Sequence, residues 1–223
     1  MATPLAVQRK IVWAEQHFRA LVAQCDRHIQ QHLDALKVDA EPSQDTLPTD
    51  LALILGDGLQ NLRSALDYLV FELVIAADGD PAKLQTFPIC ESSATFKDAT
   101  RGRKFEGFPK EMIAEIEALQ PYHAGDSLKA HPFWILNHLT NVNKHRRILL
   151  VSLRRTVAGK IPGTNDYTQI PVDAGTQVYM DVHEAVYIAV DEAEFPDKPD
   201  VCSLVDQLVK AVELILPNFD QFF

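Results

Sequence analysis

GDGLQNLRSALDYL, residues 56–69, decides the predicted fold, because its leucines recur with the spacing of one helix face. At about 100° per residue, apolar side chains gather on one arc of this helix and polar side chains on the opposite arc. The apolar arc, continued past the motif, contains Leu59, Leu62, Leu66, Leu69, Val70 and Leu73. The polar arc contains Asp57, Gln60, Asn61, Ser64, Asp67 and Tyr68. The stretch therefore predicts a helix that buries one face and presents a polar site on the other.

Apolar periodicity predicts further helices on both sides of this stretch. The predicted helices cover about residues 4–38, 48–77, 109–119, 133–151 and 201–216. Residues 79–107 are expected to be irregular, with Phe87-Pro88-Ile89 as an extended anchor, because the residue before a proline is pushed away from helix. After residue 151 the apolar spacing becomes alternating, and it predicts strands at 177–182 and 185–190 that turn near His183-Glu184.

We therefore expect a mainly α fold, a helical bundle in a single domain over residues 1–223. Its helical core covers about residues 5–151 and 201–216, and a small β-hairpin insertion covers about 152–195, ahead of the C-terminal helix. Gly56 and Gly58 lie inside the second helix, where each costs up to about 1 kcal/mol relative to alanine. We expect these glycines to allow close packing between helices.

Composition limits the classes of function. The 47% hydrophobic content suits a globular core, and no apolar run reaches the roughly 20 residues that span a bilayer. The start of the chain lacks the pattern of a secretory signal, so we expect a cytoplasmic protein. A net charge of −10 argues against an extended nucleic-acid-binding surface. Any contact with nucleic acid would be local, for example at the basic cluster of residues 144–147. The three widely spaced cysteines suggest small buried hydrophobes rather than a disulfide framework.

A second polar face is predicted on the helix at 133–151. Trp134, His138, Asn141 and His145 recur at spacings of four, three and four, so their side chains project from one side within about 60°. If this helix packs antiparallel to the helix of residues 48–77, the two polar faces meet across a cleft. A histidine titrates near neutrality, carboxylates can orient it, and Arg63 could bind a phosphate or carboxylate.

Structural interpretations of the same residues remain open. Arg63 and Asp67 could form an ordinary i,i+4 pair, Asp57 could support a helical turn, and the histidines could be core residues with satisfied ring nitrogens. Asp57, Asp67, His138 and His145 could together supply metal ligands, but the His-Glu-x-x-His pattern is missing and no metal is assigned. No cofactor is assigned either, because neither a G-x-G-x-x-G nor a P-loop pattern occurs.

Several motifs together resemble a widespread group of uncharacterised bacterial proteins. The resemblance runs from the first helix to about residue 150 and implies a shared fold and site, without an activity. In that group the last motif usually reads N-x-D-K-H-R, so Asn143 here replaces a carboxylate by an amide. The motifs are G56-D57 with N61-L-R-S-A-L-D67, then F87-P-I89, Q120-P-Y122 and N141-x-N-K-H-R146.

The chain also resembles, more distantly, the HEPN domains, helical bundles whose ribonuclease members carry R-N-x-x-x-H on a helix. Asn141 and His145 match the N-x-x-x-H part, and Thr140 stands where the arginine would be. The resemblance implies a HEPN-like bundle, an RNA or nucleotide substrate and a homodimer. It makes His145 the acid/base, Asn141 an orienting group, and Arg63 or Arg146 a phosphate contact.

These arguments give one assignment of site residues. The predicted catalytic residues are His145, Asn141 and Asp67. The predicted substrate-binding residues are Arg63, Arg146, Asn61, Asp57 and His138. The leading hypothesis is a HEPN-like ribonuclease or other hydrolase that acts on RNA or a nucleotide in a cleft between helices. The alternatives are a non-catalytic binding or regulatory module, whose polar network is structural, and an enzyme that acts on a small metabolite.

Overall fold

The computed structural model describes residues 3–36, 49–80, 86–101, 105, 107–145, 147–149, 151–160, 167–169 and 180–223. In these residues the fold is mainly α, with a small sheet ahead of the last long helix, as the sequence predicts. The α-helices are α1 (Leu5–Leu36), α2 (Thr49–Ala76), α3 (Ser93–Thr100), α4 (Lys110–Ala118), α5 (Pro132–His145) and α6 (Val201–Ile215). Two 3-10 helices are η2 (Pro121–Ala130) and η3 (Leu216–Phe222).

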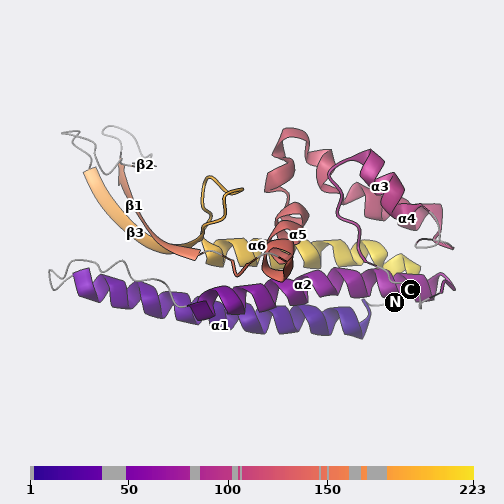
Figure 1. Cartoon of the computed structure of the whole chain (residues 1–223), viewed down its shortest axis with the longest axis horizontal. Helices are drawn as coiled ribbons and strands as arrows, with labels where there is room; N and C mark the ends of the chain where they lie inside the picture. The colour runs from indigo at the N-terminus through magenta and orange to yellow at the C-terminus, as the bar shows by residue number, and fades with distance from the viewer. Residues whose placement is uncertain are drawn as a thin grey trace.

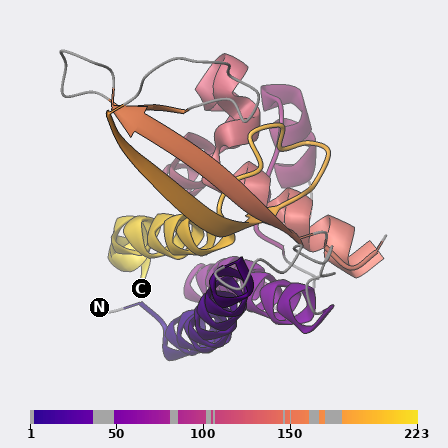
Figure 2. The same ribbon diagram turned by 90° about the vertical axis from the view of Figure 1, so that its left-hand side faces the viewer.

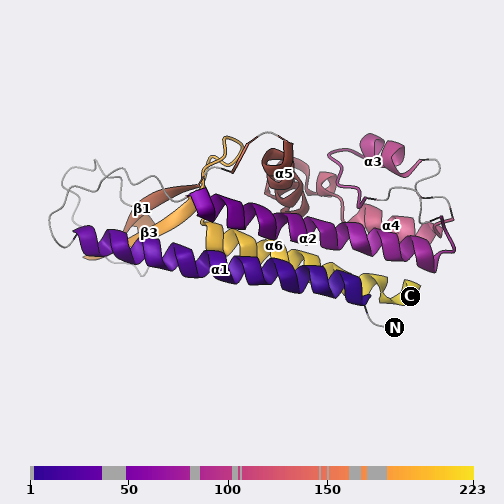
Figure 3. The same ribbon diagram turned by 60° about the horizontal axis from the view of Figure 1, so that its bottom comes forward.

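The long helices α1, α2 and α6 form the base of the molecule. Helix α2 runs antiparallel to α1, and α6 lies beside both (Figures 1 and 3). Viewed along the long axis, the three helices form a triangle, and the remaining elements lie on one side of it (Figure 2). The six apolar residues predicted to line the buried arc of α2 are all 0% exposed. Burial of this arc is therefore confirmed, and it supplies much of the core.

Two glycines allow close approach to α2 from two directions. A Cβ atom at Gly58 would overlap the ring of Phe18 on α1. A Cβ atom at Gly56 would lie 2.5 Å from Nδ2 of Asn143 on α5. The prediction that these glycines serve helix packing is confirmed, and it explains why α2 tolerates their low helix propensity.

Helix α5 ends earlier than predicted and crosses α2. It stops at His145 instead of 151, and the Arg147 N–H donates to the Val142 carbonyl (3.1 Å) at its end. The apolar residues that follow lead into a strand, because a short apolar run alone does not distinguish helix from strand. Figure 3 shows α5 nearly end-on while α2 lies across the view, so the antiparallel packing assumed for these two helices is wrong.

The segment predicted to be irregular contains α3. A capping box starts this helix: the Thr95 N–H donates to Ser92 Oγ (3.1 Å), and the Ser92 N–H donates to Thr95 Oγ1 (3.1 Å). Threonine replaces the usual acidic or amide residue of this motif, which hid the helix start from the sequence pattern. Residues 86–90 just before it are extended, as expected for the Phe87-Pro88-Ile89 anchor.

The β-insertion lies where it was predicted but pairs differently. Strand β1 (Val151–Lys160) lies between β2 (Tyr167–Gln169) and β3 (Met180–Val190), and both pairings are antiparallel. The predicted turn at His183-Glu184 is wrong, because both residues lie inside β3 opposite Ala158 and Val157. An isolated pair of polar residues is compatible with a strand as well as with a turn. Residues 177–179 of the predicted first strand lie outside the described residues.

None of the helices in the described residues combines the length and the apolar character that a membrane span requires.

Candidate functional site

Arg63 and Asp67 of α2 form a clamp on the backbone of Phe87. The Arg63 guanidinium donates to Asp67 Oδ1 (2.7 Å) and to the Phe87 carbonyl (2.7 Å), and the Phe87 N–H donates to the same Asp67 oxygen (2.9 Å). Burial lowers the pKa of Arg63 and raises the pKa of Asp67, and in each case the attraction between the two groups opposes the shift. The pair thus fixes an extended segment that lies 20 residues further along the chain.

Gln120 forms a second clamp on the same segment. Its side-chain carbonyl accepts from the Cys90 N–H (2.9 Å), and its NH2 group donates to the carbonyls of Pro88 (3.0 Å) and Ile116 (2.9 Å). The Gln120 residue is 1% exposed, so these bonds replace water that cannot reach it. Two of the motifs quoted for the bacterial group therefore hold the third motif, residues 87–89, in place.

The clamped segment leads directly to Glu91, which reaches the polar face of α5. Glu91 Oε1 accepts a hydrogen bond from Trp134 Nε1 (2.7 Å). A polar cavity of about 140 Å3 lies between this segment and the helix. The residues that line it are Glu91, Trp134, Asn137, His138, Asn141 and Val142. Trp134, His138 and Asn141 thus share one side of α5, as their spacing predicts.

His138 is held in a fixed orientation in this cavity. Its ring stacks on Trp134 with a centroid distance of 4.9 Å and an interplanar angle of 9°, and Phe195 meets it edge-on at 5.9 Å. Its Nε2 atom is buried and has no hydrogen-bond partner among the described residues. Glu194 Oε2 lies 3.4 Å from that nitrogen, outside hydrogen-bond geometry but within ion-pairing range of a protonated ring.

The loop that carries Glu194 is anchored by Arg147. Both terminal nitrogens of Arg147 donate to the Glu192 carboxylate, at 3.0 and 2.6 Å. Glu192 is 1% exposed, so the carboxylate of this bidentate pair lies in the protein interior. The basic cluster at 144–147 thus contributes one arginine, Arg147, to positioning the loop beside His138.

The charged groups around the cavity indicate which class of ligand it can bind. One carboxylate lies on its wall and another lies beside His138, and the described lining residues include neither lysine nor arginine. Two amide side chains add both donors and acceptors. The two carboxylates favour an amine or a hydroxyl group over an anion such as phosphate, and the cation Lys129 lies outside the lining, with its Nζ 5.8 Å from the Trp134 ring centroid.

Asn61 and Asp57 lie on another side of α2. Asn61 Oδ1 accepts from Lys10 Nζ (3.1 Å), and its Nδ2 donates to the Asp57 carbonyl (2.9 Å). The Asp57 side chain is exposed. Asn61 also borders a groove between α1 and α2 of about 430 Å3. The other residues of this groove are Ala6, Arg9, Lys10, Trp13 and Tyr68.

His145 is exposed at the last residue of α5, and Arg146 lies outside the described residues. The predicted site residues therefore fall in different places. Arg63 and Asp67 form the clamp, Asn61 borders the groove, and His138 shares the cavity with Asn141. The crossing of α5 over α2 separates these groups, because it replaces the side-by-side packing that a common cleft requires.

Four residues of this region were not predicted as site residues: Glu91, Asn137, Glu194 and Gln120. Asn137 follows from the same helical spacing as His138, and Gln120 belongs to a quoted motif. Glu91 reaches the cavity and Glu194 reaches His138 from segments distant in sequence, and their positions carry no periodic signal. Among the described residues, no group of three or more His, Cys, Asp or Glu side chains is placed to hold a metal ion.

Comparison with known proteins gives a uniform result: no family model, no curated protein and no solved structure matches this chain.

Proposed function

We propose that the cavity around His138 binds a small molecule rich in hydrogen-bond donors, an amine or a polyol, and that His138 exchanges a proton with it. One observation carries the proposal: His138 lines a polar cavity, and its buried Nε2 atom has no hydrogen-bond partner among the described residues. Leaving such a group unpaired costs about 1–3 kcal/mol, which a bound donor or acceptor would recover.

The surroundings of His138 support a role in proton transfer. Stacking on Trp134 fixes the ring, and Glu194 at 3.4 Å would stabilise the imidazolium that forms when Nε2 accepts a proton. Asn141, which also lines the cavity, can orient the ligand by its amide. The cavity of about 140 Å3 suits a ligand smaller than those of drug-sized sites, which are roughly 300–1,000 Å3. We therefore place an enzyme acting on a small metabolite ahead of the alternatives.

The test follows the His138 ring by 15N–1H NMR while probe molecules are added. Ethanolamine serves as the cationic donor, glycerol as the neutral donor and phosphate as the anion. We expect ethanolamine and glycerol to shift the Nε2 resonance saturably, and phosphate to leave it unchanged. His138→Gln identifies the signal, and His145→Gln, on the same helix but exposed, is the matched control.

The outcomes separate the hypotheses. A His138 signal that responds to phosphate alone, or to none of the probes, would contradict the proposal. Saturable binding of ethanolamine that leaves the proton on Nε2 unchanged would make the chain a binding module rather than an enzyme.

An RNA or nucleotide substrate, implied by the HEPN resemblance, is the second candidate, and the α1–α2 groove favours it. Trp13 and Tyr68 are 55% and 40% exposed there, Lys10 Nζ lies 5.7 Å from the Tyr68 ring centroid, and Arg9 lines the same groove. Exposed aromatic rings beside cations suit stacked bases and backbone phosphates. His145 and Asn141, the residues proposed for cleavage, lie on α5, so this candidate concerns binding first.

Tryptophan fluorescence tests this second candidate. Single-stranded RNA is expected to quench Trp13, with a strong dependence on salt, in a Trp134→Phe variant that leaves Trp13 as the sole tryptophan. The Lys10→Gln variant should weaken the quenching. Cleavage of total RNA that His145→Ala abolishes would support the ribonuclease, whereas quenching unaffected by Lys10→Gln would remove the groove from consideration.

A homodimer and a cytoplasmic location complete the proposal. The dimer follows from the HEPN resemblance, and light scattering at several concentrations tests it. All three cysteines are free thiols, which suits a reducing compartment.

A further inference from the structure

A cleft lies between α1 and α6, on one side of the triangle that the three long helices form. The volume of this α1–α6 cleft is about 380 Å3, which lies within the roughly 300–1,000 Å3 of sites for drug-sized ligands. Glu15 and Asp26 line it about three helical turns apart on α1, which corresponds to about 16 Å along the helix axis. Among the described residues, it shares no lining residue with the His138 cavity. The α1–α6 cleft can therefore hold an elongated molecule at a place separate from that cavity.

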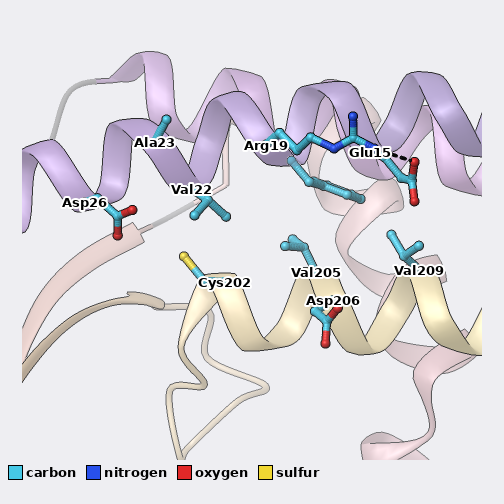
Figure 4. A pocket seen from close by; sticks show the side chains of 10 residues that line it. Glu15, Arg19, Val22, Ala23, Asp26, Cys202, Val205, Asp206 and Val209 are labelled. Carbon is cyan, nitrogen blue, oxygen red and sulfur yellow. Dashed lines mark hydrogen bonds and ion pairs between the residues drawn. The ribbon is translucent and has the colours of Figure 1, made fainter.

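The interior of the α1–α6 cleft is apolar. Figure 4 shows Val22 pointing from α1 toward α6, and Val205 and Val209 pointing from α6 toward α1. The short valine side chains leave space between the helices that leucine or methionine would partly fill. Val22 is partly exposed there, so a ligand would remove apolar surface from water. The interior therefore favours a ligand with an apolar body.

Carboxylates outnumber cations around this apolar interior. The described lining residues include three carboxylates and one guanidinium: Glu15, Asp26, Asp206 and Arg19. Arg19 donates to Glu15 (2.9 Å), so the guanidinium is already engaged by a carboxylate. Asp206 pairs with the exposed Lys210 (2.6 Å). Asp26 takes part in neither pair, so an ammonium group beside it would gain an ion pair, whereas an anion would meet a carboxylate there.

The start of α6, at the same end of the cleft as Asp26, does not reverse this preference. A helix N-terminus carries roughly half a positive charge, which attracts anions. Here the Asp200 carboxylate caps the helix and accepts from the Ser203 N–H (2.8 Å) and from the Ser203 hydroxyl (2.8 Å). The full negative charge of Asp200 outweighs the partial charge of the helix end, so this end of the cleft favours a cation.

We propose that the α1–α6 cleft binds a small cationic amphiphile, an amine with an elongated apolar body. The apolar body lies between the valines of the two helices, and the ammonium group lies beside Asp26. Because Asp26 is exposed, its ion pair is expected to tighten binding by only about two- to fivefold. Burial of the apolar body supplies the rest of the affinity.

Three probes with the same body and different head groups test the proposal: octylamine, 1-octanol and octanoate. Isothermal titration calorimetry measures their affinities for the full-length chain, and 13C–1H methyl NMR locates them. We expect octylamine to bind about two- to fivefold more tightly than 1-octanol, and octanoate to bind more weakly than 1-octanol. Added salt should reduce the advantage of the amine. The methyl signals of Val22, Val205 and Val209 should shift saturably with each probe that binds.

Two variants separate the head group from the apolar body. Asp26→Asn should remove the advantage of octylamine and leave the affinity for 1-octanol unchanged. Its matched control is Asp98→Asn, at an aspartate of α3 whose side chain is 76% exposed. Val22→Phe should fill the cleft and weaken both ligands by at least about tenfold, which corresponds to the lost burial of about two methylene groups. Its matched control is Val12→Phe, at a valine of α1 that is 49% exposed and lies outside the cleft.

The variant His138→Gln separates this site from the cavity proposed above. It should leave the affinity for octylamine unchanged, so that either proposal can fail without the other. Loss of octylamine binding in His138→Gln would place the amine in the His138 cavity and overturn the proposal for the cleft.

Other results would also overturn the proposal. These are octanoate binding as tight as that of octylamine, no binding of any probe, methyl shifts confined to residues outside the cleft, or an Asp26→Asn variant that behaves like Asp98→Asn. A dimer that Val22→Phe dissociates would likewise overturn it, because a second copy of the chain would then cover the cleft.

Discussion

The clamp on Phe87 makes a strong prediction about Asp67. Replacing Asp67 by alanine removes the acceptor of two hydrogen bonds, from the Arg63 guanidinium (2.7 Å) and from the Phe87 N–H (2.9 Å). The Arg63 side chain, only 13% exposed, then keeps a charge without a carboxylate partner. Arg63 retains its bond to the Phe87 carbonyl, but the N–H of the same residue loses its partner.

The size of the loss follows from these two orphaned groups. Removing one partner of a buried ion pair lowers stability by about 3–5 kcal/mol, and leaving a buried N–H without an acceptor lowers it by about 1–3 kcal/mol. Because the Asp67 side chain is 31% exposed, water can replace part of what is lost. We therefore expect Asp67→Ala to lower the free energy of unfolding by about 3–5 kcal/mol, a large part of the roughly 5–15 kcal/mol of a typical domain.

Urea unfolding followed by circular dichroism measures this loss. The control is Asp206→Ala on α6, which removes an i,i+4 pair with Lys210 (2.6 Å) whose side chains are more than 60% exposed, and which should change stability by less than about 0.5 kcal/mol. The stability loss of the double variant, Arg63→Met with Asp67→Ala, should be smaller than the sum of the two single losses by about 1–3 kcal/mol. A loss below about 1 kcal/mol for Asp67→Ala, or strictly additive effects, would refute the clamp.

The pH dependence tests the electrostatics of the same pair. Burial raises the pKa of Asp67 above its usual value, so the neutral form is favoured by folding. Its contribution to stability is fully present below the usual aspartate pKa and is lost as the pH rises through the raised pKa. The stability difference between wild type and Asp67→Asn should therefore grow as the pH falls through that range. A difference that shrinks on acidification would indicate an ordinary surface ion pair.

Three further predictions concern the supports of the candidate site. Gly58→Ala should destabilise the chain by about 1–3 kcal/mol, because the new methyl group would overlap the buried ring of Phe18. Gly56→Ala should cost less, because the Asn143 amide that it meets can move. Thermal unfolding of both variants compares the two losses. Gln120→Glu replaces the NH2 group that donates to two carbonyls by a carboxylate, and it should lower the free energy of unfolding by about 2–4 kcal/mol at pH 7. Part of this stability should return in acid, where the protonated carboxyl group can donate one hydrogen bond. Full stability of the variant at pH 7 would contradict the second clamp. Hydrogen bonds from Lys198 and Ser152 hold the pKa of Asp191 below its usual value. The destabilisation by Asp191→Asn should therefore be present at neutral pH and vanish as the pH falls through that lowered pKa. The midpoints of urea unfolding at several pH values measure this dependence.

The sequence identified the elements that local spacing controls. The helix at 48–77 is observed at Thr49–Ala76, and the last helix, predicted at 201–216, is observed at Val201–Ile215. The predicted single side of α5 holds for His138 and Asn141, which share a cavity. Spacing failed at the end of α5 and at the predicted turn in β3, because a short apolar run and an isolated polar pair are compatible with more than one structure.

The partners of the polar residues could not be predicted from spacing. Arg63 and Asp67 have the periodicity of a site-facing pair, yet their hydrogen bonds go to the Phe87 backbone. Glu91 carries no sequence signal, yet it bonds Trp134. In each case the deciding contact joins residues at least 20 positions apart, and its existence depends on how helices cross.

By itself, the sequence determined the helical core, the place of the β-insertion, the buried face of α2 and the shared side of His138 and Asn141 on α5, since these follow from the geometry of the backbone repeat. Only the tertiary structure decided that α5 crosses α2 and that the clamped segment brings Glu91 to the cavity that His138 lines. The physical reason is that an apolar face specifies burial without specifying a partner, whereas hydrogen bonds between distant segments form only after those faces have packed.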